Sequence, residues 1–541
     1  MSSYSQLGIN MNFKSIIKNR NFQLILIFIL IGSAFRVFQL SAGSIRGDEG
    51  GAIFVAGDTV SHYWDSISGD VHPPLYYLLL NVWIKIGGIS KFFLRLLPCL
   101  FSIATIPIGF LLGKKLFNDK IGLMSSFIFA MSQANIRYAQ TLKQYSILTF
   151  FVTLSLYYFI SYLDTPSKKT GAFWIGLSAI CMYLHYYSFL IILAEFIFLL
   201  VFYKKYKQIF LRTFLLFILV GVLVLPLVPM FYGQMSIKTN IEQEALASEP
   251  LHDLGFGLNI NNIFVRVGLM FYHLSAGYLK VNFSSPFFIL LFALICGTFF
   301  IPFSSVLKKI KDSRASFLCI LISVPTLIFS FLWFFKIIPP HIYARFILFI
   351  SPLLYILISV GIVLFSKRFD KFSKIFSPRN IILLFVILIL LFNSVSLYSY
   401  YNERPDWENW EAVSESIVDD EDSIILIYPA VYVFNLDYSY TGDSKYYLLP
   451  GVVPNSELIS FKDYTDEGMK PLNDCSFLNK IPSNVDKISV ILHRDALDNQ
   501  DVSPFKECLS DELTFVSDTS SSFMSHGEKI TDLFVLTYST T

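Results

Sequence analysis

The sequence predicts a polytopic α-helical membrane protein of about 11 spans, with a small extracytoplasmic α/β domain at its C-terminus. Of its 541 residues, 54% are hydrophobic and only 15% are charged, which is too apolar for a soluble chain of this length. Charge divides the chain as well: residues 401–541 hold 26 acidic and 9 basic residues, a net charge of −17, whereas residues 1–400 are strongly basic. We therefore expect a membrane domain over 1–400 and an acidic soluble domain over 401–541.

Eleven apolar runs are interpreted as membrane spans. The first, 22–40, follows a basic segment and is not followed by a small-residue cleavage site, so it is expected to be an uncleaved anchor. A further run, 73–88, would reach only about 22 Å as a helix, short of the ~30 Å hydrocarbon core, and is interpreted as an interfacial or re-entrant helix. The other ten spans are expected near 95–112, 121–136, 145–163, 172–186, 187–203, 213–231, 287–303, 316–335, 345–366 and 380–400.

Lysine and arginine in the short loops predict the orientation. If 73–88 does not cross, the basic connections share one side with the N-terminus, which is then cytoplasmic, and the C-terminal domain is extracytoplasmic. The outer loops 41–94 and 232–286 are long, and polar residues gather on that face, which favours a functional site there; long loops also hold more polar residues for no special reason. All eight histidines would lie outside: His62, His72, His185, His252, His273, His341, His493 and His526.

The C-terminal segment has the pattern of a small α/β domain. A helix is expected over Glu408–Val418, and β-branched or aromatic runs predict strands at Ser423–Tyr428, Lys487–Leu492 and Thr531–Tyr538. Four of the six cysteines lie in apolar runs and are interpreted as packing residues. The other two, Cys475 and Cys508, could pair in an oxidising compartment.

The adjacent carboxylates of Asp48 and Glu49 follow the first span directly. They are placed between glycines, which let the backbone turn and approach a ligand. Such a pair attracts cations, although Asp-Glu also occurs on many solvated loops. Its position at a membrane surface makes it the leading candidate for a catalytic centre.

Cationic side chains are expected on the same face. His72 precedes two prolines that open a helix, where an anionic group such as phosphate is favoured. Arg137 and Lys143 lie in a polar patch between two apolar runs, and Arg345 lies at the outer end of a span. Lone cations at helix ends are usually anchors that reach the interface; here they share a face with paired carboxylates.

These motifs together resemble the N-terminal half of the GT-C membrane glycosyltransferases, in particular the group of protein O-mannosyltransferases and lipid A aminoarabinose transferases. The resemblance covers about the first 200 residues well and the rest loosely. The motifs that carry it are Asp48-Glu49, His72-Pro73-Pro74-Leu75-Tyr76-Tyr77, Leu94-Arg95-Leu96-Leu97-Pro98, Leu111–Phe117, Tyr138-Ala139-Gln140, His185-Tyr186, Arg345-Phe346-Ile347 and Asp406-Trp407-Glu408-Asn409-Trp410.

The resemblance implies a polyprenyl-phosphate-sugar donor and a hydroxyl acceptor, which would be a glycolipid, a polysaccharide or a protein. It implies that Asp48 is the base or the carboxylate that orients the acceptor, and that Glu49 is its catalytic partner and a candidate metal ligand. His72, Arg137, Lys143 and Arg345 become the expected contacts of the donor phosphate, with His72 as a second candidate metal ligand. Substrate contacts are expected from Tyr138, Gln140, Tyr145, His185 and Tyr186.

The residue types fit this chemistry independently. Sugar transfer from a phosphate needs a base for the acceptor hydroxyl and cations for the leaving phosphate. Inverting transfer needs only one in-line carboxylate, and a divalent Mg, Mn or Zn ion could assist it. The chain departs from its relatives after Gln140, where Thr141-Leu142-Lys143 stands in place of Glu-Ala-Arg, and Lys cannot make the bidentate grip of Arg.

Two functions of other classes are weighed against a hexosyl- or pentosyltransferase. A transporter or flippase of lipid-linked sugars would be favoured by charges in mid-span and by internal repeats; Glu195 is the main mid-span charge, and no clear repeat is found. A non-catalytic envelope assembly protein is the third interpretation. Membrane lipids are expected around the spans and no nucleic-acid partner is expected.

Overall fold

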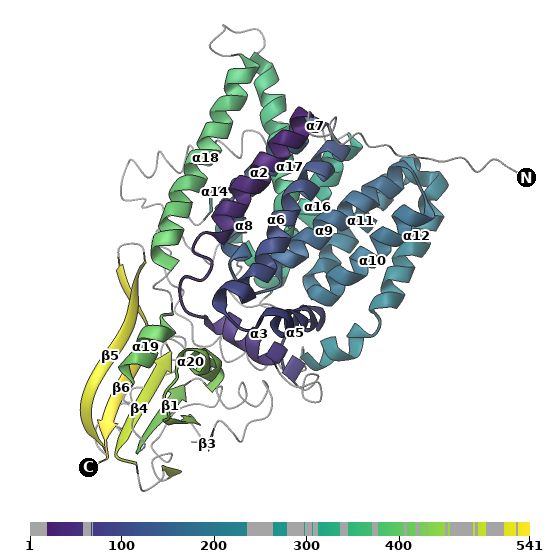
Figure 1. The fold of residues 1–541 in the computed structure, drawn as a ribbon. Coiled ribbons are helices and arrows are strands. Elements are labelled where there is room, and N and C mark those ends of the chain that lie inside the picture. Colours follow the sequence, from purple (N-terminus) through teal and green to yellow (C-terminus); the bar gives the residue numbers. More distant parts are fainter. Residues whose placement is uncertain are drawn as a thin grey trace, which may run out of the picture.

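The computed structural model contains a helical bundle and, after residue 422, a small sheet domain at one end of the bundle (Figure 1). Apart from residue 297, the predicted span at 287–303 lies outside the described residues. So do the cysteines Cys296, Cys475 and Cys508 and the histidines His62, His252, His341 and His526. The structure describes residues 19–57, 66–67, 69–234, 263–277, 297, 304, 306, 312–335, 344–369, 377–404, 408–417, 422–428, 430–449, 453–454, 480–481, 485–493, 513–525 and 528–540.

Within these ranges, seven helical segments are long and apolar enough to cross a membrane. This confirms a polytopic α-helical membrane protein, and the total of eleven spans stays a prediction. The seven are α2 (Arg20–Val37), α6 (Lys91–Leu116), α9 (Tyr145–Asp164), α12 (Tyr203–Val224), α16 (Ser313–Phe334), the joined η2 (Ala344–Ile350), α17 (Ser351–Ser366) and η3 (Lys367–Phe369), and α18 (Pro378–Glu403).

Shorter helices complete the described part of the bundle. They are α7 (Asp119–Met131), α8 (Gln133–Ala139), α10 (Lys168–Leu184), η1 (Tyr186–Ser188), α11 (Phe189–Val201) and α14 (Ile263–Ala276). The turn predicted between 172–186 and 187–203 is confirmed, because His185 ends α10 in an extended conformation and its ring accepts a hydrogen bond from the Tyr187 amide.

One predicted span is divided in the structure. The sequence predicted continuous helix over 121–136, whereas α7 ends at Met131 and α8 begins at Gln133. Ser132 between them is extended and its hydroxyl caps α8. The same hydroxyl lies 2.7 Å from the Tyr355 hydroxyl of α17, which also accepts from the Asn135 amide at 2.9 Å. A buried polar network therefore decides where the helix breaks.

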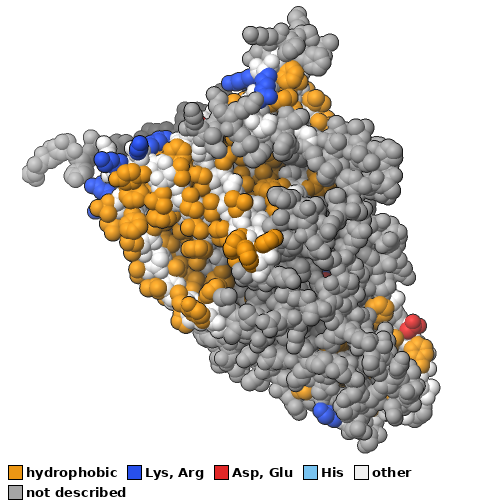
Figure 2. Space-filling view, turned by 180° about the vertical axis from the view of Figure 1, so that it is seen from behind, with side chains coloured by type: hydrophobic (Ala, Val, Ile, Leu, Met, Phe, Trp, Pro, Cys, Tyr) orange, Lys and Arg blue, Asp and Glu red, His pale blue; other side chains and the backbone are white. Residues whose placement is uncertain are grey.

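The bundle is packed closely at one helix pair and is apolar outside. A Cβ on Gly113 of α6 would lie 2.9 Å from the Cα of Gly122 of α7, so the two backbones can approach only because both residues are glycine. Figure 2 shows hydrophobic side chains over much of the described surface on the side of α12, with Lys and Arg at one end. Exposed leucine, isoleucine and valine side chains of α12 contribute to this surface, as expected where helices face lipid.

The end of the bundle opposite the sheet domain holds the basic connections. Lys114 pairs with Asp119 at 2.9 Å, and Lys115 pairs with Asp164 at 3.3 Å. Asp164 also pairs with Arg314 at the start of α16. Loops far apart in sequence thus meet at one end of the helices, as the lysine and arginine pattern predicted.

Two short helices, α3 (Gly47–Gly57) and α5 (Leu75–Gly87), lie across the end of the bundle that faces the sheet domain (Figure 1). The 13 residues of α5 are too few to cross a bilayer, in agreement with the expectation of an interfacial or re-entrant helix at 73–88. The described helices between the first two long helices, α3 and α5, therefore form a platform at this end of the bundle (Figure 1).

The sheet domain has six strands in the order β3-β2-β1-β4-β6-β5. The three strands β2, β1 and β4 are parallel to one another. Strands β1 (Ser423–Tyr428) and β4 (Lys487–His493) and strand β6 (Glu528–Ser539) confirm the three predicted strands. The helix expected over Glu408–Val418 is the shorter α19 (Trp410–Ser416). Not predicted were α20 (Val433–Ser439), β2 (Lys445–Leu448), β3 (Val453–Pro454) and β5 (Thr514–Ser525).

Candidate active site

Asp48 is the second residue of α3, on the side that faces the bundle. Its Oδ2 accepts a hydrogen bond from Nη1 of Arg345 at 2.6 Å, and half of its side chain remains exposed. Desolvation by the surrounding protein would raise the pKa of Asp48, but Arg345, Lys143 and His72 outweigh it and hold the pKa below its usual range. The site therefore presents an ionised carboxylate that solvent or a substrate can reach.

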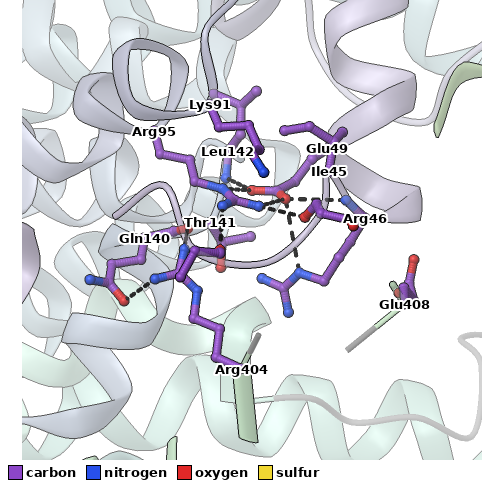
Figure 3. A network of polar contacts seen from close by, with 12 residues as sticks. Ile45, Arg46, Glu49, Lys91, Arg95, Gln140, Thr141, Leu142, Arg404 and Glu408 are labelled. Atoms are coloured by element: carbon purple, nitrogen blue, oxygen red, sulfur yellow. Dashed lines mark hydrogen bonds and ion pairs between the residues drawn. The ribbon is translucent and has the colours of Figure 1, made fainter. Parts of the chain in front are cut away.

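Glu49, the next residue, is fully buried and all its contacts are within the protein. The guanidinium of Arg95 grips both of its oxygens, with Nε at 3.0 Å and Nη2 at 2.7 Å, and the amide of Leu142 donates to Oε1 at 2.8 Å. Figure 3 shows Arg95 and Arg46 converging on this carboxylate. Burial would raise the pKa of Glu49, but Arg95, Arg46 and the Leu142 amide lower it to about 2. These contacts favour a structural role, and the catalytic role expected for Glu49 stays a prediction.

Lys143 is buried in the turn between α8 and α9, and its ammonium group interacts with the carboxylates of Asp48 and Asp70. Burial would lower the pKa of Lys143, but Asp48 and Asp70 outweigh it and the pKa is raised. The cation is thus retained in a buried position because two carboxylates face it.

His72 and Asp70 form a second acidic and basic pair at the start of α5. Nδ1 of His72 lies 3.0 Å from Oδ1 of Asp70, and the hydroxyl of Tyr77 donates to Oδ2. Burial would raise the pKa of Asp70, but His72 and Lys143 hold it below its ordinary value. The carboxylate fixes the imidazole orientation in the way that second-sphere partners do in many enzymes.

Two aromatic side chains line the same region. The Arg345 guanidinium lies 5.9 Å from the ring centroid of Tyr145 at the start of α9. His185 lies between Tyr145 and His72, with ring centroids 6.1 Å and 5.6 Å away. The structure therefore brings together six residues named from the sequence: Asp48, His72, Lys143, Tyr145, His185 and Arg345.

Tyr186 is linked to this cluster indirectly, through Gln234. Its hydroxyl donates to Gln234 at 2.7 Å, and the Gln234 amide donates to the backbone carbonyls of Ile67 and His72. Tyr186 thereby holds the segment that carries His72. Its predicted substrate contact stays a prediction, and its observed partners are protein groups.

Gln140, Tyr138 and Arg137 have other surroundings. Gln140 is fully buried, and its amide donates to the carbonyls of Arg36 and Phe38 and accepts from Tyr400 and Arg404. Figure 3 shows Arg404 reaching Gln140. Tyr138 packs edge-on against Tyr145. Arg137 acts electrostatically on His273 of α14. The predicted substrate contacts of Tyr138 and Gln140 and the phosphate contact of Arg137 stay predictions.

The two residues expected as metal ligands have different surroundings. Both Glu49 oxygens accept N–H hydrogen bonds, so Glu49 does not fit that role. The contact with Asp70 occupies only Nδ1 of His72, as it often does in metal-ligating histidines. In the part of the chain that the structure describes, His, Cys, Asp and Glu side chains do not gather in threes as metal sites require. We therefore derive no chemical step through a metal.

Two residues of the site were missed from the sequence. Asp70 was given no role, although an acidic residue two positions before His72 could have been suspected as its partner. Tyr76 is fully buried on α5 beside Lys143 and Asp48, and its hydroxyl has no hydrogen-bond partner among the described residues. A buried hydroxyl without a partner facing a charged cluster is suited to contact a ligand.

Comparison with known proteins assigns the architecture. Residues 71–232 match the family model of the dolichyl-phosphate-mannose-protein mannosyltransferases. The structure superposes on ArnT from Cupriavidus metallidurans, apo and bound to undecaprenyl phosphate, with a TM-score of 0.57 in both cases, at 11% and 12% identity and over 95% of this chain and 97% of ArnT. The chain has the GT-C glycosyltransferase fold.

Two further matches extend the GT-C comparison. The oligosaccharyltransferase AglB from Archaeoglobus fulgidus, in complex with an inhibitory peptide and a dolichol-phosphate, superposes with a TM-score of 0.53 at 9% identity, over 95% of this chain and 75% of AglB. An uncharacterized protein of Aquifex aeolicus (strain VF5) is 33% identical over 111 residues, which is 20% of this chain and 21% of that relative. The chain thus covers about a fifth of the length of this curated relative.

Proposed function

We propose that the protein is an integral-membrane glycosyltransferase that moves a sugar from a polyprenyl-phosphate-sugar donor to a hydroxyl group of a glycolipid, a polysaccharide or a protein. The observation that carries the proposal is the Asp48 carboxylate, ionised and half exposed, among Arg345, Lys143 and His72. A base next to a group of cations is what transfer from a phosphate-linked sugar requires. The GT-C fold and the match over residues 71–232 support the same reaction class.

Asp48 is the base in this proposal. It accepts the proton of the acceptor hydroxyl while the acceptor oxygen bonds to the anomeric carbon of the sugar. The bond from that carbon to the phosphate oxygen breaks, and polyprenyl phosphate leaves with the electron pair. Because Glu49 is held by Arg95 and Leu142, and Asp70 by His72 and Tyr77, neither supplies a second carboxylate to the reaction, which favours a single displacement with inversion.

Arg345 and Lys143, with the imidazole of His72 beside them, receive the negative charge of the leaving phosphate. Arg345 has a double role, because its guanidinium is hydrogen-bonded to Asp48 in the structure. A donor phosphate competes for this guanidinium and draws it from Asp48. The carboxylate then loses its strongest cationic partner and becomes a better base when the donor is in place. Lys143 is buried between two carboxylates and supplies a second, fixed positive charge.

The place of the site agrees with a lipid-borne donor. The Asp48 cluster lies at the end of the bundle, where α3 and α5 lie across the helices, and not in the middle of the spans (Figure 1). A phosphate attached to a polyprenyl chain reaches this level while the chain remains in the membrane. Transport of the whole glycolipid would instead need polar groups along a path through the bilayer.

A donor-consumption assay tests the proposal. Purified protein in lipid nanodiscs is incubated with a panel of radiolabelled polyprenyl-phosphate hexoses and pentoses and with candidate glycolipid and peptide acceptors. We expect one donor to lose its label to an acceptor and to release polyprenyl phosphate. Movement of intact donor between leaflets without release would favour a flippase. If no donor is either consumed or moved, that outcome would contradict the proposal.

A further inference from the structure

The C-terminal domain contacts the helix that carries Asp48 through several side chains. Phe54 of α3 stacks on Phe434 of α20 with ring centroids 4.1 Å apart. The Asn435 amide, fully buried, donates to the carbonyl of Ile45 at 2.9 Å. Tyr438 of α20 donates to the carbonyl of Ile89. The platform of the site is therefore held from the bundle on one side and from the soluble domain on the other.

Two glycines of the acidic motif make this docking possible. A Cβ on Gly47 would lie 2.8 Å from the ring of Tyr432, and a Cβ on Gly50 would lie 2.8 Å from Oδ1 of Asn435. Contacts this short leave no room for a side chain. Gly47 and Gly50 therefore present bare backbone to the C-terminal domain, while Asp48 and Glu49 between them face the bundle.

Glu408 makes the contact nearest to Asp48. It lies between α18 and α19, at the start of the C-terminal domain, and its Oε2 accepts a hydrogen bond from the Gly47 amide at 2.7 Å. Its backbone has φ of +43°, in the left-handed region that residues with a side chain rarely adopt. The fold therefore tolerates strain in order to place this carboxylate at the start of α3.

The position matters because of what a helix start demands. The first amides of a helix have no partner inside it, and a carboxylate in the first turn is drawn to them. Glu49 already satisfies the Arg46 amide, with Oε2 at 3.3 Å. Because Glu408 satisfies the Gly47 amide from outside, Asp48 is not needed as a cap and can turn to Arg345.

We propose that Glu408 is a positioning residue that caps α3 from the C-terminal domain and thereby keeps Asp48 directed at its substrate. This inference rests on the proposed function, because it assigns the purpose of the cap to sugar transfer. It makes the C-terminal domain part of the catalytic unit. Loss of the cap lets Asp48 bend back to its own helix, a displacement of the kind that costs up to about 10²-fold in rate.

Three variants test the cap. Glu408→Ala removes the acceptor, Glu408→Gln retains a carbonyl oxygen of similar reach, and Glu411→Gln changes a neighbouring acid that pairs with Lys91 at the surface. We expect kcat to fall about 10- to 100-fold in Glu408→Ala, with KM for the donor and Tm nearly unchanged. Glu408→Gln should recover most of the rate, and Glu411→Gln should match the wild type.

Amide hydrogen exchange gives a reading that needs no activity. In Glu408→Ala the amides at the start of α3 should exchange at least tenfold faster, while those of β1 remain protected. Unchanged exchange at α3 in Glu408→Ala would overturn the cap, whatever the activity assay shows. Faster exchange with unchanged kcat would overturn the catalytic purpose alone, and absence of transfer by the wild type would instead count against the proposed function.

Discussion

Asp48 and Glu49 are neighbours in the chain, yet the two sides of α3 that they occupy are built in opposite ways. The Glu49 side is dry and closed, with a bidentate arginine and a backbone amide on one carboxylate. The Asp48 side is half exposed and holds a carboxylate among the basic side chains of Arg345, Lys143 and His72, which come from three separate segments. One turn of helix can thus place a buried, fully paired carboxylate and a half-exposed carboxylate next to each other.

The largest expected effect concerns the exposed side. Asp48→Asn preserves the size of the side chain but cannot accept a proton. We expect the transfer rate to fall by about 10²–10⁴-fold, the usual contribution of a general base, with Tm and donor binding nearly unchanged. Single-turnover transfer of labelled sugar measures the rate, and a near wild-type rate would remove Asp48 from its role.

The second prediction addresses the buried side. Glu49→Gln leaves the Arg95 charge buried without its partner, so we expect a loss of about 3–5 kcal/mol in the free energy of unfolding. Because the pKa of Glu49 is lowered to about 2, its carboxylate stabilises the fold above about pH 4.5, and this stabilisation is lost as the pH falls toward 2. The variant should lack that part of the pH dependence.

Thermal unfolding between pH 7 and pH 3 measures both effects. Glu411→Gln serves as the matched control, since its partner Lys91 lies at the surface and such pairs contribute about 1 kcal/mol or less. Recovery of Glu49→Gln activity by raised Mg, Mn or Zn would contradict the anchor role and restore the metal-ligand interpretation.

The third prediction concerns Arg345, which pairs with Asp48 and is proposed to receive the donor phosphate. Arg345→Ala removes a charge-assisted contact that typically contributes about 1.5–3 kcal/mol, so we expect kcat/KM for the donor to fall about 10- to 150-fold. Stability should change little, because the pair with Asp48 is half exposed. Donor titrations give this value, with Arg314→Ala at the opposite end of the bundle as control.

The smallest effect is a shift in the pH profile. The pKa of Asp48 is held below its usual range, so in the wild type this base stays ionised as the pH falls from 7 to 5. Arg345→Gln removes the leading cation, and the pKa of Asp48 rises. We expect the acid limb of kcat/KM to move to higher pH by up to about one unit, and coincident limbs in variant and wild type would show that Arg345 does not control this base.

Much of the architecture could be predicted because its signals are local. Hydropathy located most long helices, and the β-branched run Ser423–Tyr428 coincides with β1 to the residue. The partners in the site could not be predicted in this way. Asp48 meets Arg345 across 297 positions, and Glu49 meets Arg95 across 46. Arg95 did leave a signal, since an arginine at the start of an apolar run needs a buried counter-charge.

The break at Ser132 and the cap by Glu408 were missed for a related reason. Apolar runs of 16 residues predict one helix when each residue is judged by its own hydropathy. What divides α7 from α8 is a hydroxyl on α17, more than 200 positions later. Tertiary contacts of this kind override local preference, and single-sequence patterns do not contain them.

The contacts of Gln140 have a consequence for how the protein is made. Gln140 accepts from Arg404, which the ribosome adds 264 residues later, and α3 waits for Glu408, which follows Gly47 by 361. At roughly 5–20 residues per second, these partners emerge well over ten seconds after the segments that they complete. The nascent chain therefore completes its early helices before the contacts of Gln140 with Arg404 and of Gly47 with Glu408 can form, and a product of interrupted translation lacks the residues that make them.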